Sequence, residues 1–203
     1  MRLMKKLLFL AVLVALFCGI NHTAFAQVDT GLVAKFLDTA KSAQDSQLGA
    51  IASELTGKMQ ALGDSLGVND AVKKTLDNTL ESLTGGRDSE ALTHAFDLVK
   101  AARFTPEQLG IAKQVGNLAS AYVMQKNFAT LEGSQNDVAT VVSSLRKGPL
   151  TAAIAPLKNV AANTHLSDGQ KTLVKTVADK YAPGWQKAKD AMDAFKKLPG
   201  FGN

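Results

Sequence analysis

One pair of carboxylates around a histidine has the spacing of a possible metal site. His94 follows Glu90 by four residues and precedes Asp97 by three, so the three side chains share one face of the helix expected there. Imidazole and carboxylate groups can bind Zn²⁺ or a harder cation, although such a site needs a further ligand from elsewhere. The same residue types also make an ordinary water-facing surface. We favour that interpretation and predict no metal ligand.

A second histidine, His165, lies in the connection Asn163–Leu166 and close in sequence to Asp168. A loop histidine beside a carboxylate could serve as a general base. No partner in the sequence marks it for that role, and we expect a surface residue. The chain also lacks G-x-S-x-G, H-E-x-x-H, the phosphate-binding glycine loops and the EF-hand loop. We therefore predict no catalytic residue, while an enzyme without recognisable motifs remains an alternative.

Methionine and aromatic side chains raise two further possibilities. Axial haem ligation could use Met59, Met124 or Met192, but they lie on apolar stripes where methionine usually fills gaps, and no C-x-x-C-H is present. We predict no cofactor. Aromatic residues gather late in the chain, at Tyr122, Phe128, Tyr181, Trp185, Phe195 and Phe201. They could line a ligand groove, although core filling is the more common role.

The N-terminus predicts export. Residues 1–26 contain a positive start (Arg2, Lys5 and Lys6), an apolar run over 7–17, and Ala24-Phe25-Ala26 before Gln27. This is the pattern of a cleaved signal peptide, and the apolar run is too short to span a bilayer. The alternatives are a retained anchor and lipidation at Cys18, which the bulky Phe17 before it disfavours. We expect a periplasmic or extracellular protein of bacterial origin.

Removal of residues 1–26 changes the composition. The whole chain has a net charge of +5, but the exported part holds 20 Lys and Arg against 18 Asp and Glu. The net charge of this part is therefore only +2. Without a cluster of basic residues, so small a charge does not indicate nucleic-acid binding. Cys18 is the only cysteine, so the exported part forms no disulfide. It also has no second apolar run long enough for a membrane segment.

The pattern of apolar residues predicts helices throughout the exported part. The first apolar stripe predicts an unusually long helix. Apolar residues recur with an eleven-residue period from Leu37 to Leu66, broken only by Gln44. That period fits a nearly straight helix. Asp45-Ser46 could also begin a new helix there. We favour one helix over about 30–66, with a kink allowed near 45–49.

Boundary residues divide the remainder. Asn69 or Asp70, and then Asp88 or Ser89, are expected N-caps on either side of the stop at Gly85-Gly86. The clearest start is a capping box formed by Thr105 and Gln108 with Pro106 between them, and Ser167 with Gln170 makes another. Further helices are expected to begin at Ser134, to be split at Pro156, and to occupy about 185–195.

A faint internal similarity accompanies these caps. Asn69-Asp70 and two helices lead to a Thr-x-x-Gln cap, as Asn136-Asp137 and two helices lead to a Ser-x-x-Gln cap. The separation slides from 67 to 62 residues. Matching caps recur by chance in helical proteins, so a duplication of 69–131 in 136–181 stays open.

Taken together, these patterns predict an all-α fold. We expect a single domain over 27–203, a compact bundle of about seven or eight helices. The expected function is non-catalytic: an interaction or structural module of the cell envelope with a protein partner, or a carrier of a small apolar ligand. A membrane-active helical protein and an enzyme are the alternatives.

Overall fold

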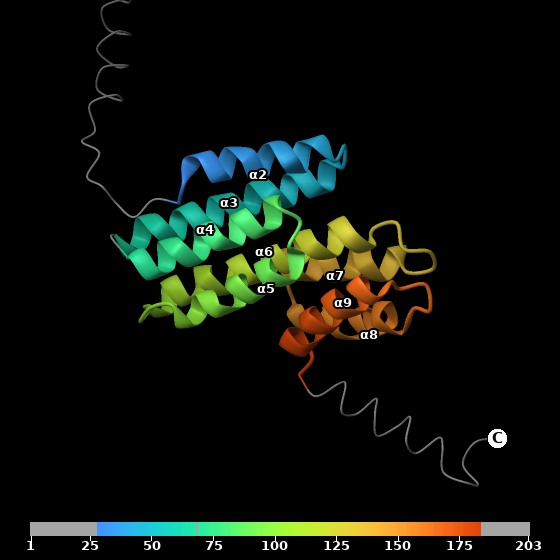
Figure 1. Cartoon of the computed structure of the whole chain (residues 1–203). Helices are drawn as coiled ribbons and strands as arrows, with labels where there is room; N and C mark the ends of the chain where they lie inside the picture. The colour runs from blue at the N-terminus through green and yellow to red at the C-terminus, as the bar shows by residue number, and fades with distance from the viewer. Residues whose placement is uncertain (1–27, 68, 184–203) are drawn as a thin grey trace, which may run out of the picture.

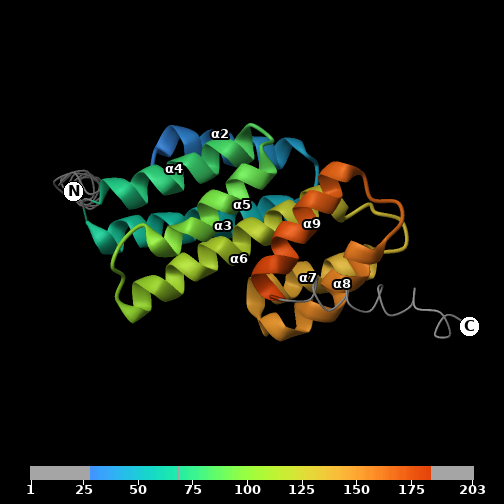
Figure 2. The same cartoon turned by 60° about the horizontal axis from the view of Figure 1, so that its bottom comes forward.

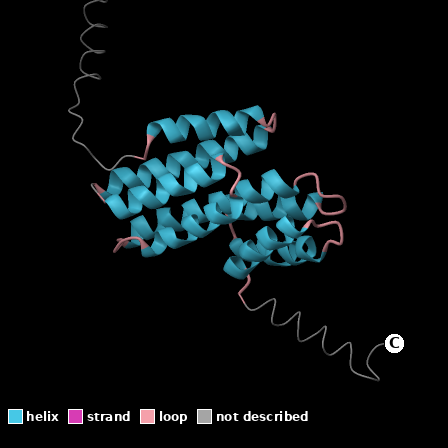
Figure 3. Cartoon of the chain, in the orientation of Figure 1, coloured by secondary structure: helices cyan, strands magenta, loops and turns pink. Residues whose placement is uncertain are grey.

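The computed structural model describes residues 28–67 and 69–183, and this part of the chain is helical without a strand (Figure 3). The α-helices are α2 (Thr30–Ser42), α3 (Ser46–Leu66), α4 (Asp70–Thr84), α5 (Asp88–Asp97), α6 (Pro106–Phe128), α7 (Gln135–Lys147), α8 (Ile154–Ala162) and α9 (Asp168–Tyr181). Short 3-10 turns precede α8, at Leu150–Ala153, and follow α5, at Leu98–Lys100. The predicted signal peptide and the helix expected over 185–195 lie outside the described residues.

The prediction of one helix over 30–66 is wrong. The chain turns at Gln44, whose φ of 55° is left-handed, and Asp45 caps a new helix by accepting the N–H groups of Gln47 and Leu48 at 2.8 and 3.1 Å. Figure 1 shows α2 folded back beside α3. Gln44 is exposed, whereas a straight helix would have placed it on the buried stripe. The turn therefore places Gln44, the one polar residue of the apolar stripe, at the surface and not in the core.

Helix α6 packs against both the preceding helices α2–α5 and the following helices α7–α9, and it links these two parts of the molecule. Figure 2 shows it running from the α2–α5 part toward the α7–α9 part, and it packs most extensively on α3 and α7. The predicted capping box is confirmed, because Gln108 N–H donates to Thr105 Oγ1 at 3.3 Å and Thr105 N–H to Gln108 Oε1 at 3.0 Å. Small buried residues such as Gly116 and Ala119 let neighbouring helices approach α6 closely.

A single apolar core runs through the described helices. Its largest fully buried side chains include Phe36 of α2, Leu55 and Met59 of α3, and Tyr122 and Phe128 of α6. The Phe36 and Tyr122 rings meet at a centroid distance of 4.9 Å. Burial of such large apolar side chains contributes about 1.5–3 kcal/mol each, which makes this core the main source of stability.

The internal similarity extends to hydrogen bonds. Gln108 Nε2 donates to the Ser65 carbonyl at 2.9 Å, and Gln170 Nε2 to the Asn127 carbonyl at 2.7 Å; each pair is 43 residues apart. Gln170 and Asn127 each lie 62 residues after their counterparts Gln108 and Ser65. At this offset of 62 residues, buried Ser82 matches Ser144, Gly86 (φ 72°) matches Gly148 (φ 71°), and buried Ala91 matches Ala153. The Asn136-Asp137 part of the predicted match is wrong, because Ser134 is the N-cap of α7. Helices α4–α6 and α7–α9 are thus two units of similar local construction.

Candidate functional site

The two carboxylates near His94 each accept a hydrogen bond from a positively charged side chain. Arg87 Nε donates to Glu90 Oε2 at 2.8 Å, and Lys100 Nζ to Asp97 Oδ1 at 2.8 Å. His94 itself is half-buried on α5. Within residues 28–67 and 69–183, no three His, Cys, Asp or Glu side chains are placed to hold a metal ion together.

His165 is exposed in the loop before α9. Its backbone N–H donates to Asn163 Oδ1 at 2.8 Å. The nearby Asp168 carboxylate accepts from Lys171 Nζ at 2.8 Å, and this hydrogen bond lowers the pKa of Asp168. No hydrogen bond joins the His165 imidazole to another described side chain, so the structure does not bring the two residues together as a base and its orienting acid.

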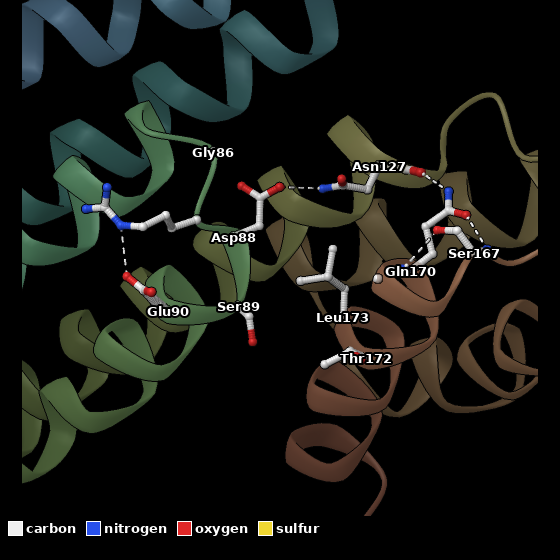
Figure 4. Close-up of a pocket in the computed structure, with 11 residues that line it drawn as sticks. Gly86, Asp88, Ser89, Glu90, Asn127, Ser167, Gln170, Thr172 and Leu173 are labelled. Carbon is white, nitrogen blue, oxygen red and sulfur yellow. Dashed lines mark hydrogen bonds and ion pairs between the residues drawn. The ribbon is translucent and has the colours of Figure 1, made fainter.

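An open cleft of about 490 Å³ lies where α5 and α9 begin beside the C-terminal end of α6 (Figure 4). We call it the α5/α9 cleft. Its lining comes from three separated segments of the chain: Gly86–Glu90, Asn127, and the first turns of α9 with Ser167, Gly169, Gln170, Thr172 and Leu173. No sequence pattern predicts this convergence, because it depends on how α9 packs on α6.

The centre of the cleft wall is Asp88, and its role differs from the predicted one. The sequence predicts Asp88 or Ser89 as the N-cap of α5, and both are wrong, because Arg87 holds that position without a side-chain cap bond. The Asp88 carboxylate instead points toward α6, where Asn127 Nδ2 donates to it at 2.9 Å (Figure 4). Lys126 Nζ also donates to it, at 2.9 Å. The Asp88 side chain is only 7% exposed. Burial of a carboxylate is costly unless hydrogen bonds and an opposite charge compensate for the lost water, and Lys126 and Asn127 supply that compensation.

The network continues from Asn127 into α9. The Asn127 carbonyl accepts from Gln170 Nε2, and the Gln170 side-chain oxygen accepts the Ser167 N–H at 3.0 Å. Ser167 Oγ in turn accepts the Gln170 N–H at 3.3 Å, which confirms the second capping box. These groups are therefore committed to holding α5, α6 and α9 together. The arrangement offers a hydrogen-bonding surface, but no hydroxyl is hydrogen-bonded to a histidine there.

A second open hollow of about 560 Å³ lies between α3 and α7, and residues of α6 also line it. We call it the α3/α7 groove. Arg146 of α7 donates two hydrogen bonds to the Glu54 carboxylate of α3 across it, and these bonds hold the pKa of Glu54 below its usual range. Leu150 borders the groove and is 39% exposed, the one large apolar side chain of the described part that lies so open.

The two tyrosines of the late aromatic group do not share a groove. Burial, with the Asp88 charge nearby, raises the pKa of Tyr122 to about 12, and its ring packs on α2. The Tyr181 hydroxyl donates to Asn117 Oδ1 at 3.0 Å and lies 3.2 Å from Ser120 Oγ, and burial raises its pKa. Both therefore join helices. Trp185, Phe195 and Phe201 lie outside the described residues.

None of the described helices combines the length and apolarity needed to cross a membrane. No known protein family, curated protein or solved structure matches the chain.

Proposed function

We propose that this is an exported, non-catalytic helical protein that acts by binding a partner protein at its open surface clefts. The observation that carries the proposal is the contrast between interior and surface. The core, to which α6 contributes, is filled by large apolar side chains, whereas the α5/α9 cleft and the α3/α7 groove open to solvent and have polar rims. A carrier of a small apolar ligand is expected to enclose an apolar cavity of about 300 Å³ or more.

The placement of the histidines supports the non-catalytic part of the proposal. A general base needs to lie within hydrogen-bond reach of a nucleophile or a bound water. His165 is exposed in a loop and His94 lies half-buried on α5, and neither lines the two hollows. The buried carboxylate Asp88 is already bound by Lys126 and Asn127.

Export is the other part of the proposal, and it rests on residues 1–26. Signal peptidase cleavage after Ala26 would give a protein that starts at Gln27, in the envelope or the surroundings of a bacterium. N-terminal sequencing of protein recovered from the host tests this directly. A diacylated species that begins at Cys18 would show that a different peptidase acts.

Native mass spectrometry of the protein, purified gently from its own host, tests the function. The proposal predicts a complex with a second protein. A retained lipid would favour the apolar-ligand carrier instead. A bare monomer that turns over a substrate, with turnover abolished by His165→Ala, would refute the binding function and identify an enzyme.

A further inference from the structure

One wall of the α3/α7 groove is built from residues with small side chains. Ser53, Gly57 and Ala61 follow one another at four-residue intervals along α3, so they lie on the same face of that helix. A Cβ added at Gly57 meets no atom within 4 Å. Leu118 and Leu145, 4% and 2% exposed, line the groove beside the polar Gln114 and Asn117 of α6, so the trough offers apolar contacts over part of its surface.

The rim of the groove is positively charged. Lys58, Arg146 and Lys147 line it together with a single acid, Glu54, which Arg146 already binds. Lys58 and Lys147 form no ion pair with another residue of the described part. Charge complementarity therefore favours an occupant that carries carboxylates on either side of apolar side chains.

We propose that the α3/α7 groove is a docking site for an acidic amphipathic helix of the partner protein. Leucine-like side chains of that helix contact Leu118, Leu145 and Leu150, and its carboxylates meet Lys58 and Lys147. A helix laid in a groove is a common mode of recognition, and the small residues of α3 allow its close approach. This inference rests on the proposed function, because it names the chemistry of the partner.

Two other occupants fit the groove less well. Residues 184–203 of the chain itself carry four lysines against two aspartates, so they share the sign of the rim. A membrane surface would be expected to meet a contiguous apolar patch, whereas Leu150 is the one large apolar side chain that lies exposed in the described part. Both remain outcomes of the test.

Selection from a phage-displayed library of randomised helical peptides, with the protein purified from its host as bait, tests the proposal. We expect enriched peptides to combine leucine-like residues with Glu or Asp, and to lose binding about tenfold or more to Gly57→Leu, which fills the trough. Gly49→Leu is the matched control, since Gly49 lies on the same helix, also has open space at its Cβ and does not line the groove. Both variants are expected to melt no lower than wild type.

Three outcomes would overturn the docking site. These are no enrichment, enrichment of basic peptides, and binding that Gly57→Leu leaves unchanged. In the last case partner binding itself would survive, because the peptides would bind another surface. Failure of the proposed function would appear separately, as a protein that retains no partner in native mass spectrometry.

Charge reversal supplies an independent arm of the test. Lys58→Glu with Lys147→Glu should weaken an enriched acidic peptide about tenfold or more, while Lys74→Glu with Lys158→Glu, both exposed and outside the groove, should change its affinity little. Vesicles of phosphatidylglycerol serve as the lipid probe. Vesicle binding that is lost in the groove variant, without binding of acidic peptides, would identify a lipid-headgroup site and refute the helix.

Discussion

Asp88 and Asp97 belong to the same helix, yet their ion pairs have different surroundings. The Asp88 side chain is 7% exposed and its partner Lys126 is 32% exposed, whereas Asp97 and Lys100 are 51% and 76% exposed. Removal of a partner from a buried carboxylate leaves a charge that water cannot reach, but removal of an exposed partner leaves a hydrated one.

We therefore expect Lys126→Ala to lower the free energy of unfolding by about 1–3 kcal/mol. The matched variant Lys100→Ala should cost about 0.5 kcal/mol or less, because its pair is exposed. Urea denaturation of both variants measures the difference. Equal losses would mean that Asp88 is hydrated in solution and that the wall of the α5/α9 cleft is more open than described.

The buried Tyr122 and the partly buried Tyr181 offer a second comparison between single residues. The Tyr181 hydroxyl is bound to Asn117 and Ser120, while the Tyr122 hydroxyl forms no hydrogen bond with another described residue. Tyr181→Phe should therefore cost about 1 kcal/mol, and Tyr122→Phe should be nearly neutral or stabilising. Thermal unfolding of the two variants decides the point. A larger loss for Tyr122→Phe would reveal a partner for that hydroxyl, such as an ordered water.

At the scale of helices, the local starts were predictable from the sequence and the long-range pairings were not. Thr105 and Ser167 reveal their caps because a capping box depends on residues three positions apart. The end of α2 was not predicted, because the spacing of apolar residues continues from α2 into α3. That spacing alone does not distinguish one long helix from two helices joined by a turn. Asp88 was misassigned because a capping aspartate and one that pairs across to α6 look alike in sequence. Both hollows escaped prediction for the same reason, since residues from distant helices line them.

Gln108 has two functions that one substitution can separate. Its Oε1 accepts the Thr105 N–H, and its Nε2 donates to the Ser65 carbonyl of α3. Gln108→Glu keeps the acceptor of the capping box but loses the donor, so we expect a loss of about 1 kcal/mol from the contact between α3 and α6. Thr105→Ala, which removes the cap alone, should cost a similar amount. Chemical denaturation tests both, and no loss in Gln108→Glu would contradict the bond to Ser65.

The link between α3 and α7 should make stability depend on pH. Hydrogen bonds from Arg146 lower the pKa of Glu54 from its ordinary value of 4.5. The stabilisation is therefore complete above that value and is lost as the pH falls through the lowered pKa of the folded protein. Glu54→Gln should cost at most about 1 kcal/mol at neutral pH, since Glu54 is 45% exposed, and nothing in strong acid.

Melting curves of wild type and Glu54→Gln at about pH 7 and about pH 2.5 check this dependence. A difference between the two proteins that persists unchanged in acid would show that Glu54 stabilises the fold through packing rather than through its charge.

At the scale of the whole molecule, a filled apolar core lies beside open hollows with polar rims. The all-helical class and the confirmed caps follow from local sequence patterns. The similarity between α4–α6 and α7–α9 is visible in the sequence only at a few caps, while the folded chain reveals it through the paired bonds of Gln108 and Gln170. We propose that this molecule works by holding another protein in these hollows.

Site-specific photo-crosslinking inside the host tests that claim most directly. A photoreactive residue replaces Ala61 in the α3/α7 groove, Ser89 in the α5/α9 cleft, or, as a control, the exposed Ala155 of α8. The account predicts one discrete adduct with a second protein from Ala61, Ser89 or both, and none from Ala155. Absence of a protein adduct at both hollows, or the same adducts from all three positions, would contradict it.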